Sequence, residues 1–483
     1  MLLGLSVFPM FEATCRLAGW GAKITPVDVF AEFDSSRKLF ALSADKTEYR
    51  VADDRRAYFA EESFPANKSP GTFRIFVFGG STVQGRPFSI PTSFGTFLKL
   101  GLQHAEPSRN WEVVNCGGVS YASYRLLPIV EECLNYQPDL FIVCAGHNEF
   151  LECVTYGEAM SASSGIRDAR IWLNSLHSLR LLRHTLQTQS TAASGDGVPG
   201  RAMLPDEVDA LLDHQGGLEA YTKASLHRGP IVEQFGLNLQ QMVDLSKASD
   251  VRLMFMRPPS NLADCPPFKS EFSASSDTAV RKKIVEQLKA AQSLQRDDLS
   301  RSIRLLESTA ELDPEFAFTW YQLGRSYLLS RRIEDAQSAF VQARDADVCP
   351  LRMTSSLAQT LQQVASRNRI LHWNVHRFLE GQSRHGIVGD STLVDHVHPS
   401  FRSNQKIAVE LIERFAPLLG VSTSEDWKAA AEATFEAHLQ SLNDMYYLRG
   451  RQTLENLKAW AAGRGDGPRL KLPHTSDDAN AAH

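Results

Sequence analysis

Five short apolar segments, each followed directly by small or polar residues, constrain the fold of this chain more than any other feature. They are Arg74–Phe78, Trp111–Asn115, Asp139–Cys144, Val251–Met256 and Ile370–Val375. Helical patterns lie between them, as at 124–136 and 231–247. This alternation predicts an α/β fold with a parallel, doubly wound sheet. In such folds ligands bind beyond the carboxyl ends of the strands, where the small polar residues of this chain gather.

Length and charge limit the classes of protein that remain. The chain has 483 residues, more than one compact domain usually holds, so we expect two to four structural units. Its 51 basic and 56 acidic residues exclude a basic nucleic-acid binder, and no nucleic-acid partner is expected. Charged residues make up 22% and aromatic residues 9%, which excludes global disorder.

The N-terminal segment, residues 1–70, has an apolar beginning and no clear periodicity after residue 20. Residues 1–20 are mostly apolar until Glu12 and Arg16, without a basic start or a small-residue cleavage site, so they make a poor signal peptide. No run of about 18 apolar residues is present. The segment could be the end of a membrane anchor or a helix docked on the protein. Localisation therefore stays open between an extracytoplasmic or membrane-anchored protein and a cytoplasmic one.

Two insertions interrupt the predicted core, which then occupies residues 71–265 and 350–420. The first, about 151–230, contains the polar stretch Thr188–Gly200 and is expected to form a helical cap with a flexible loop. The second, 272–349, lies between the fourth and fifth strands. Helices at 421–462 and a disordered tail at 463–483 complete the expected organisation.

The second insertion resembles a tetratricopeptide repeat. The matching residues are Trp320, Leu323, Gly324, Tyr327, Ala336, Phe340 and Ala343. The resemblance implies paired helices and a groove for a protein partner; the alternative interpretation is a structural elaboration of the cap. Because an inserted unit leaves and rejoins its host at neighbouring points, we hypothesise a disulfide between Cys265 and Cys349, with two buried free thiols as the alternative.

Four residues with catalytic potential follow predicted strands. Ser81 lies in a glycine-flanked turn after the first strand, and Asn148 follows the third. Asp395 and His398 follow the fifth strand, three positions apart, so one turn of chain can bring the carboxylate to the imidazole. That bond would fix the histidine tautomer while the other ring nitrogen takes the proton of Ser81. The pattern predicts nucleophilic catalysis by a serine.

These segments together resemble the SGNH (GDSL-like) hydrolase family. The matching stretches are Gly79–Thr82 for the first block, Asn115 with the glycines after it for the second, Gly146–Glu149 for the third and Asp395–His398 for the last. The resemblance implies a three-layer α/β/α, flavodoxin-like core and acyl transfer through a serine ester. Ser81 would be the nucleophile, His398 the general base and acid, and Asp395 its orienting partner. No cofactor and no metal are implied.

The resemblance also implies an oxyanion hole, formed by the Ser81 backbone N–H, a backbone N–H of the second block and the Asn148 side chain. The second-block donor is Ser120 by counting from Asn115, whereas Gly118 is the nearest glycine; both stay open. The chain departs from the family pattern at two further positions. Gly80 stands where Asp is frequent, and Glu149 stands where Asp is usual, with His147 beside it.

Other kinds of site fit the sequence less well. The G-x-S-x-G elbow of α/β-hydrolases is absent around Ser81, and no P-loop or dinucleotide-binding glycine motif occurs. His396 and His398 could form a metal pair with Asp395, but the sequence offers no further ligand set.

The expected function is hydrolysis of a short acyl ester, such as an acetylated carbohydrate or a lipid ester, with the acyl donor implied by the resemblance alone. One alternative is a polysaccharide O-acyltransferase of the same fold. Another is a non-catalytic scaffold that binds a partner through the repeat-like insertion.

Overall fold

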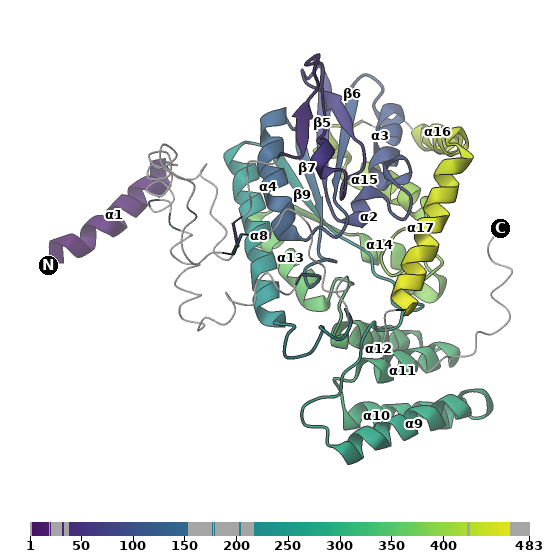
Figure 1. Ribbon diagram of the computed structural model, residues 1–483. Coiled ribbons are helices and arrows are strands. Elements are labelled where there is room, and N and C mark those ends of the chain that lie inside the picture. The colour runs from purple at the N-terminus through teal and green to yellow at the C-terminus, as the bar shows by residue number, and fades with distance from the viewer. Residues whose placement is uncertain are drawn as a thin grey trace.

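A five-stranded parallel sheet forms the centre of the protein (Figure 1). The computed structural model describes residues 2–18, 20, 31–32, 38–152, 176, 178, 202–203, 217–422 and 426–463. The strands are β5 (Thr72–Gly79), β6 (Asn110–Gly117), β7 (Leu140–Cys144), β9 (Arg252–Arg257) and β10 (Leu371–Asn374). They lie in the order β10-β9-β7-β5-β6, all parallel. Counted along the chain this is the order 2-1-3-4-5 of flavodoxin-like folds, so the predicted fold class is confirmed.

Helices cover both faces of this sheet, as the apolar strands require. Every residue of β5 is buried, because its side chains alternate between two cores. Phe76 and Phe78 belong to one core, with α4 (Ser123–Cys133), α8 (Arg228–Ala248) and α13 (Ser355–Asn368). Ile75 and Val77 belong to the other, with α3 (Phe94–Ala105), α15 (Phe401–Leu419) and α16 (Trp427–Ser441). The result is a three-layer α/β/α arrangement.

A second, antiparallel sheet lies within the N-terminal segment and was missed by the sequence analysis. Its strands are β2 (Phe40–Leu42), β3 (Glu48–Val51) and β4 (Ser63–Pro65). Strands of three or four residues are too short to show a hydrophobic period. Phe40 and Phe64 pack edge-on against Tyr136, which attaches this sheet to the core.

The extreme N-terminal residues form α1 (Leu2–Ala18), which leaves Met10 and Leu17 exposed. Among the described residues, no helix has both the length and the apolar character needed to cross a bilayer. A short parallel pair joins β1 (Ala31–Glu32) to β8 (Ala202–Met203). Most of the predicted cap, its loop Thr188–Gly200 and the tail from 464 lie outside the described residues.

Four consecutive helices follow β9 and lie beyond the carboxyl ends of the strands (Figure 1). They are α9 (Thr278–Asp297), α10 (Leu299–Leu312), α11 (Ala317–Leu329) and α12 (Ile333–Ala346). The close contact of α11 with α12 depends on Gly324, where an added Cβ would lie 2.7 Å from the Phe340 ring. Leu323, Ala336 and Phe340 are buried in the core of this unit.

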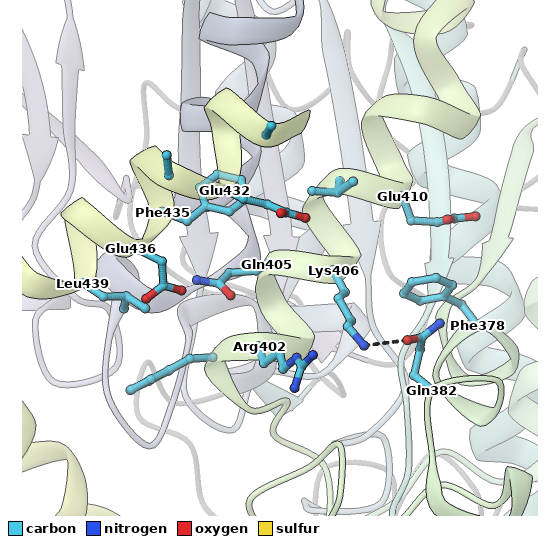
Figure 2. A pocket seen from close by; sticks show the side chains of 14 residues that line it. Phe378, Gln382, Arg402, Gln405, Lys406, Glu410, Glu432, Phe435, Glu436 and Leu439 are labelled. Carbon is cyan, nitrogen blue, oxygen red and sulfur yellow. Dashed lines mark hydrogen bonds between the residues drawn. The ribbon is translucent and has the colours of Figure 1, made fainter. Parts of the chain in front are cut away.

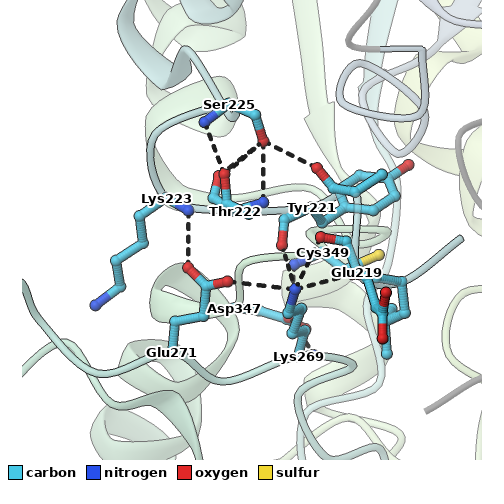
Figure 3. A network of polar contacts seen from close by, with 11 residues as sticks. Glu219, Tyr221, Thr222, Lys223, Ser225, Lys269, Glu271, Asp347 and Cys349 are labelled. Carbon is cyan, nitrogen blue, oxygen red and sulfur yellow. Dashed lines mark hydrogen bonds and ion pairs between the residues drawn. The ribbon is translucent and has the colours of Figure 1, made fainter. Parts of the chain in front are cut away.

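The two ends of this helical unit meet at a carboxylate. Asp347 accepts hydrogen bonds from the backbone N–H groups of Phe268 (2.8 Å), Lys269 (3.0 Å) and Cys349 (3.0 Å). The Lys269 ammonium group donates to the carbonyl groups of Leu218 and Tyr221, at 3.0 and 2.6 Å (Figure 3). The disulfide hypothesis is wrong, because Cys265 is a free thiol. Polar contacts to a buried carboxylate hold these ends together instead.

The C-terminal helices pack beside the core. Helix α17 (Asp444–Gly463) places Tyr446, Tyr447 and Gly450 against Phe88, the Gly450 position being so close that a Cβ there would overlap the ring. A groove of about 910 Å³ lies between α14 (Val375–Glu380), α15 and α16 (Figure 2). Its lining includes none of the four residues with predicted catalytic potential.

Candidate active site

Ser81 begins a short helix directly after β5, an interior strand of the sheet. Strand β5 ends at Gly79, and Ser81 is the first residue of α2 (Ser81–Gln84). An added Cβ at Gly79 would lie 2.4 Å from the carbonyl oxygen of Cys144, so glycine lets the ends of β5 and β7 approach each other. The turn therefore presents the Ser81 hydroxyl at the carboxyl edge of the sheet.

His398 connects Ser81 to Asp395. Its Nε2 atom lies 2.8 Å from Ser81 Oγ, and its Nδ1 atom lies 2.6 Å from Asp395 Oδ2. With the proton on Nδ1 donated to the carboxylate, Nε2 accepts the hydrogen bond of the serine hydroxyl. The predicted residues thus form one continuous hydrogen-bonded chain, the arrangement that activates a serine for attack.

The Asp395 carboxylate is held in its ionised form. Burial alone would raise its pKa, but the neighbouring His398 and His396 rings and the hydrogen bonds to it lower the pKa below the usual range. Its second oxygen, Oδ1, accepts the backbone N–H groups of Val397 (2.9 Å) and His398 (2.8 Å). These bonds fix the carboxylate, so Oδ2 stays directed at the imidazole.

Asn148 lies against the backbone that leads into Ser81. Its Nδ2 donates to the carbonyl of Tyr121 at 3.0 Å, which uses one of the two amide hydrogens. An added Cβ at Gly80 would lie 2.6 Å from this nitrogen. Within the described part of the chain, this amide group has no other acceptor. Any side chain at position 80 would therefore displace this amide.

The two candidates for the second-block donor differ in their hydrogen bonds. The Gly118 N–H donates to the carbonyl of Gly79 at 3.0 Å and is therefore occupied. The Ser120 N–H has no acceptor among the residues that the structure describes. Ser120 also has φ of 65°, a left-handed conformation that glycine adopts more readily. Of the two candidates, Ser120 is thus the one whose backbone N–H has no acceptor among the described residues.

Two residues near the third block support the site without joining the triad. Glu149 accepts hydrogen bonds from the backbone N–H (3.0 Å) and hydroxyl (2.7 Å) of Ser123, the first residue of α4. Burial raises its pKa to about 7. His147 accepts the backbone N–H of Met353 at Nδ1, 3.1 Å away, and burial lowers its pKa well below the usual value.

The Asn115 side chain forms hydrogen bonds at the carboxyl end of β6. Its Nδ2 donates to the carbonyl of Val83 at 2.7 Å, and its Oδ1 accepts the N–H of Gly117 at 2.9 Å. The side chain therefore ties the end of β6 to α2, which carries Ser81.

The alternative metal pair finds no support in the geometry. Both ring nitrogens of His398 are within hydrogen-bond distance of triad partners. Burial lowers the pKa of His396 to about 4, and the ring packs edge-on against Phe268 with 5.3 Å between the ring centroids.

One residue in contact with the triad loop was not identified from the sequence. Asn261, four positions after β9, donates its backbone N–H to the carbonyl of His396 at 2.9 Å. Its side-chain amide donates to the carbonyl of Asp395 at 3.1 Å. The available signal was a polar residue beyond the carboxyl end of the fourth strand. No recognised motif surrounds it, so the sequence did not distinguish it from other polar residues.

Comparison with known proteins gives matches in structure alone. No protein-family model matches the sequence, and no curated protein matches it. An acetylxylan esterase from Geobacillus stearothermophilus is similar with a TM-score of 0.32 and 10% identity, over 73% of this chain and 96% of that chain. A lipase/acylhydrolase from Enterococcus faecalis is similar with a TM-score of 0.32 and 10% identity, over 73% of this chain and 100% of that one.

Proposed function

We propose that the protein is a serine-dependent ester hydrolase of the SGNH type. The observation that carries the proposal is the continuous chain Asp395–His398–Ser81, with 2.6 and 2.8 Å between successive partners. A buried, ionised carboxylate, an imidazole and a hydroxyl in this order are the components of nucleophilic acyl transfer. The Asn148 amide beside Gly80 and the unengaged N–H of Ser120 supply the donors that such a reaction needs.

The reaction proceeds in two halves through a covalent intermediate. Ser81 Oγ attacks the ester carbonyl carbon while its proton passes to His398 Nε2, and the carbonyl oxygen becomes an oxyanion that the Ser81 N–H, Ser120 N–H and Asn148 amide stabilise. The C–O bond to the alcohol then breaks, and His398 returns the proton to the leaving oxygen. In the second half, water attacks the acyl carbon of the acyl-enzyme while His398 Nε2 takes its proton. The bond to Ser81 Oγ then breaks, His398 returns the proton to that oxygen, and the acid leaves. Asp395 stabilises the imidazolium formed in each half.

The proposed substrate is a short acyl ester, either an acetylated carbohydrate or a small lipid ester. This choice of acyl group comes from the family resemblance of the four blocks. The triad and the oxyanion donors act on the ester carbonyl, so they do not select the alcohol.

Labelling with a fluorophosphonate probe tests the proposed nucleophile. The probe phosphonylates activated serines, so the wild type is expected to be labelled and Ser81→Ala is not. Ser308→Ala, which alters an exposed serine of α10, is the matched control and should label like the wild type. Labelling that persists in Ser81→Ala, or an unlabelled wild type, would exclude Ser81 as the nucleophile.

A further inference from the structure

The loop that carries Asp395 and His398 is closed by its own backbone but has few anchors at its tip. Val394 N–H donates to the His398 carbonyl at 2.9 Å, and Ser400 N–H donates to the Thr392 carbonyl at 3.0 Å. These bonds form a narrow hairpin whose tip is Asp395, His396 and Val397. Hydrogen bonds within the hairpin fix its shape. Its orientation relative to Ser81 depends on contacts with other segments of the chain.

Asn261 supplies such contacts from the segment after β9. Its backbone N–H and its Nδ2 bind the two successive carbonyl groups of the tip, those of His396 (2.9 Å) and Asp395 (3.1 Å). The same Nδ2 donates to Asp390 Oδ1 at 2.8 Å, on the approach to the hairpin. The fully buried Asn261 therefore binds both the tip of the loop and the segment that leads into it.

The Asn261 side chain is itself held in one orientation. Its Oδ1 accepts the backbone N–H of Asp264 at 3.0 Å, which fixes the oxygen and nitrogen ends of the amide. Its carbonyl accepts the Nη1 of Arg352 at 2.8 Å, and Arg352 in turn contacts Asp347 at 3.4 Å. Both ends of the helical unit formed by α9–α12 are thereby connected to the residue that binds the triad loop.

We propose that Asn261 is a positioning residue that sets the Asp395–His398 pair at its distance from Ser81, an inference that rests on the proposed hydrolase function. The residue does not touch Ser81 or the imidazole; it acts through the carbonyl groups of Asp395 and His396. Errors of about 1 Å in such a pair can cost on the order of 100-fold in rate. A positioning role should thus affect the rate constant of the chemical step more than substrate binding.

Hydrolysis of p-nitrophenyl acetate by purified full-length variants tests the proposal. Asn261→Ala is expected to lower kcat by about 10- to 100-fold with KM little changed. Its pH–rate profile should move to lower pH, because a carboxylate that is less well placed stabilises the protonated imidazole less. Asn368→Ala, which removes an amide bound to Gln240 and distant from the triad in the fold, is the matched control and should leave kcat and the profile unchanged.

A milder variant covers the case in which Asn261→Ala fails to fold. Asp390 is exposed, and Asp390→Ala removes only the outer partner of the Asn261 amide. It should lower kcat several-fold and move the pH profile in the same direction. Folded Asn261→Ala with wild-type kcat and pH profile, or Asp390→Ala with neither change, would overturn the proposal while Ser81-dependent activity of the wild type upheld the hydrolase. Absence of activity in the wild type would overturn both.

Discussion

The Nε2 atom of His398 lies 2.8 Å from the hydroxyl oxygen of Ser81, although 317 positions separate the two residues in the chain. Ser81 follows β5, an interior strand of the sheet, and His398 follows β10 at its edge. The carboxyl ends of parallel strands lie on one side of a sheet, so the fold brings both segments to the same edge. The predictions below depend on this relationship and on the contacts that support it.

Replacing the Asp395 carboxylate should nearly abolish turnover without unfolding the protein. Asp395→Asn is expected to lower kcat for p-nitrophenyl acetate by about 10³- to 10⁴-fold, because an amide no longer selects the tautomer that leaves Nε2 free to accept the serine proton. Asp297→Asn, at the exposed end of α9, serves as the control for loss of a charge. Activity of Asp395→Asn within tenfold of the wild type would exclude the proposed triad.

Loss of the Asn148 amide should weaken stabilisation of the oxyanion. Asn148→Ala is expected to lower kcat by about 10²- to 10³-fold with a small change in KM, since the bond strengthens only as negative charge develops. Steady-state kinetics measure both quantities. Asn135→Ala, an exposed asparagine bound to the Glu132 carbonyl, should match the wild type.

The close approach of Gly80 to Asn148 makes a separate prediction. In Gly80→Ala the new Cβ would lie 2.6 Å from Asn148 Nδ2, so the amide must move and kcat should fall. A double-mutant cycle with Asn148→Ala should show strong non-additivity, because both changes disable the same donor. Gly229→Ala is the control, since a Cβ there meets nothing within 4 Å. Additive losses in the cycle would separate Gly80 from the oxyanion donor.

Glu149 should make the folded state less stable as the pH rises towards neutrality. Its pKa is raised from 4.5 to about 7 by burial, so between these values the unfolded chain loses a proton that the folded protein keeps. The free energy of unfolding therefore falls as pH rises through this window, by up to about 3 kcal/mol. Urea denaturation of wild type and Glu149→Gln at several pH values isolates this contribution, because the difference between the two should change between pH 5 and 7. A pH-independent difference would contradict the shift.

Stability of the helical insertion should depend on Asp347 and be independent of disulfide chemistry. Asp347→Ala leaves three backbone N–H groups and Arg352 without their shared acceptor and is expected to cost about 3–5 kcal/mol of unfolding free energy. Cys265→Ser should change that free energy by less than about 0.5 kcal/mol, and a reductant should have no effect. A large loss in Cys265→Ser, reproduced by reducing the wild type, would restore the disulfide hypothesis.

Much of the fold was predictable because its signals are local. Each of the five strands of the central sheet is a short apolar run, small residues directly follow the first three, and this pattern lies in consecutive residues. Asp395 and His398 are likewise three positions apart, so their contact needs only one turn of chain. By contrast, β2–β4 were missed because each strand has three or four residues and their pairing depends on Tyr136 in another part of the sequence.

The sequence by itself determined the strand–helix alternation, the serine turn and the Asp395–His398 pair. Only the tertiary structure shows that the Gly118 N–H already has an acceptor, the Gly79 carbonyl, whereas the Ser120 N–H has none among the described residues. It also replaced the disulfide hypothesis with the Asp347 contacts and revealed Asn261 beneath the catalytic loop. Hydrogen bonds of this kind join groups that are far apart along the chain, so they have no pattern in sequence and exist only once the sheet and its loops have formed.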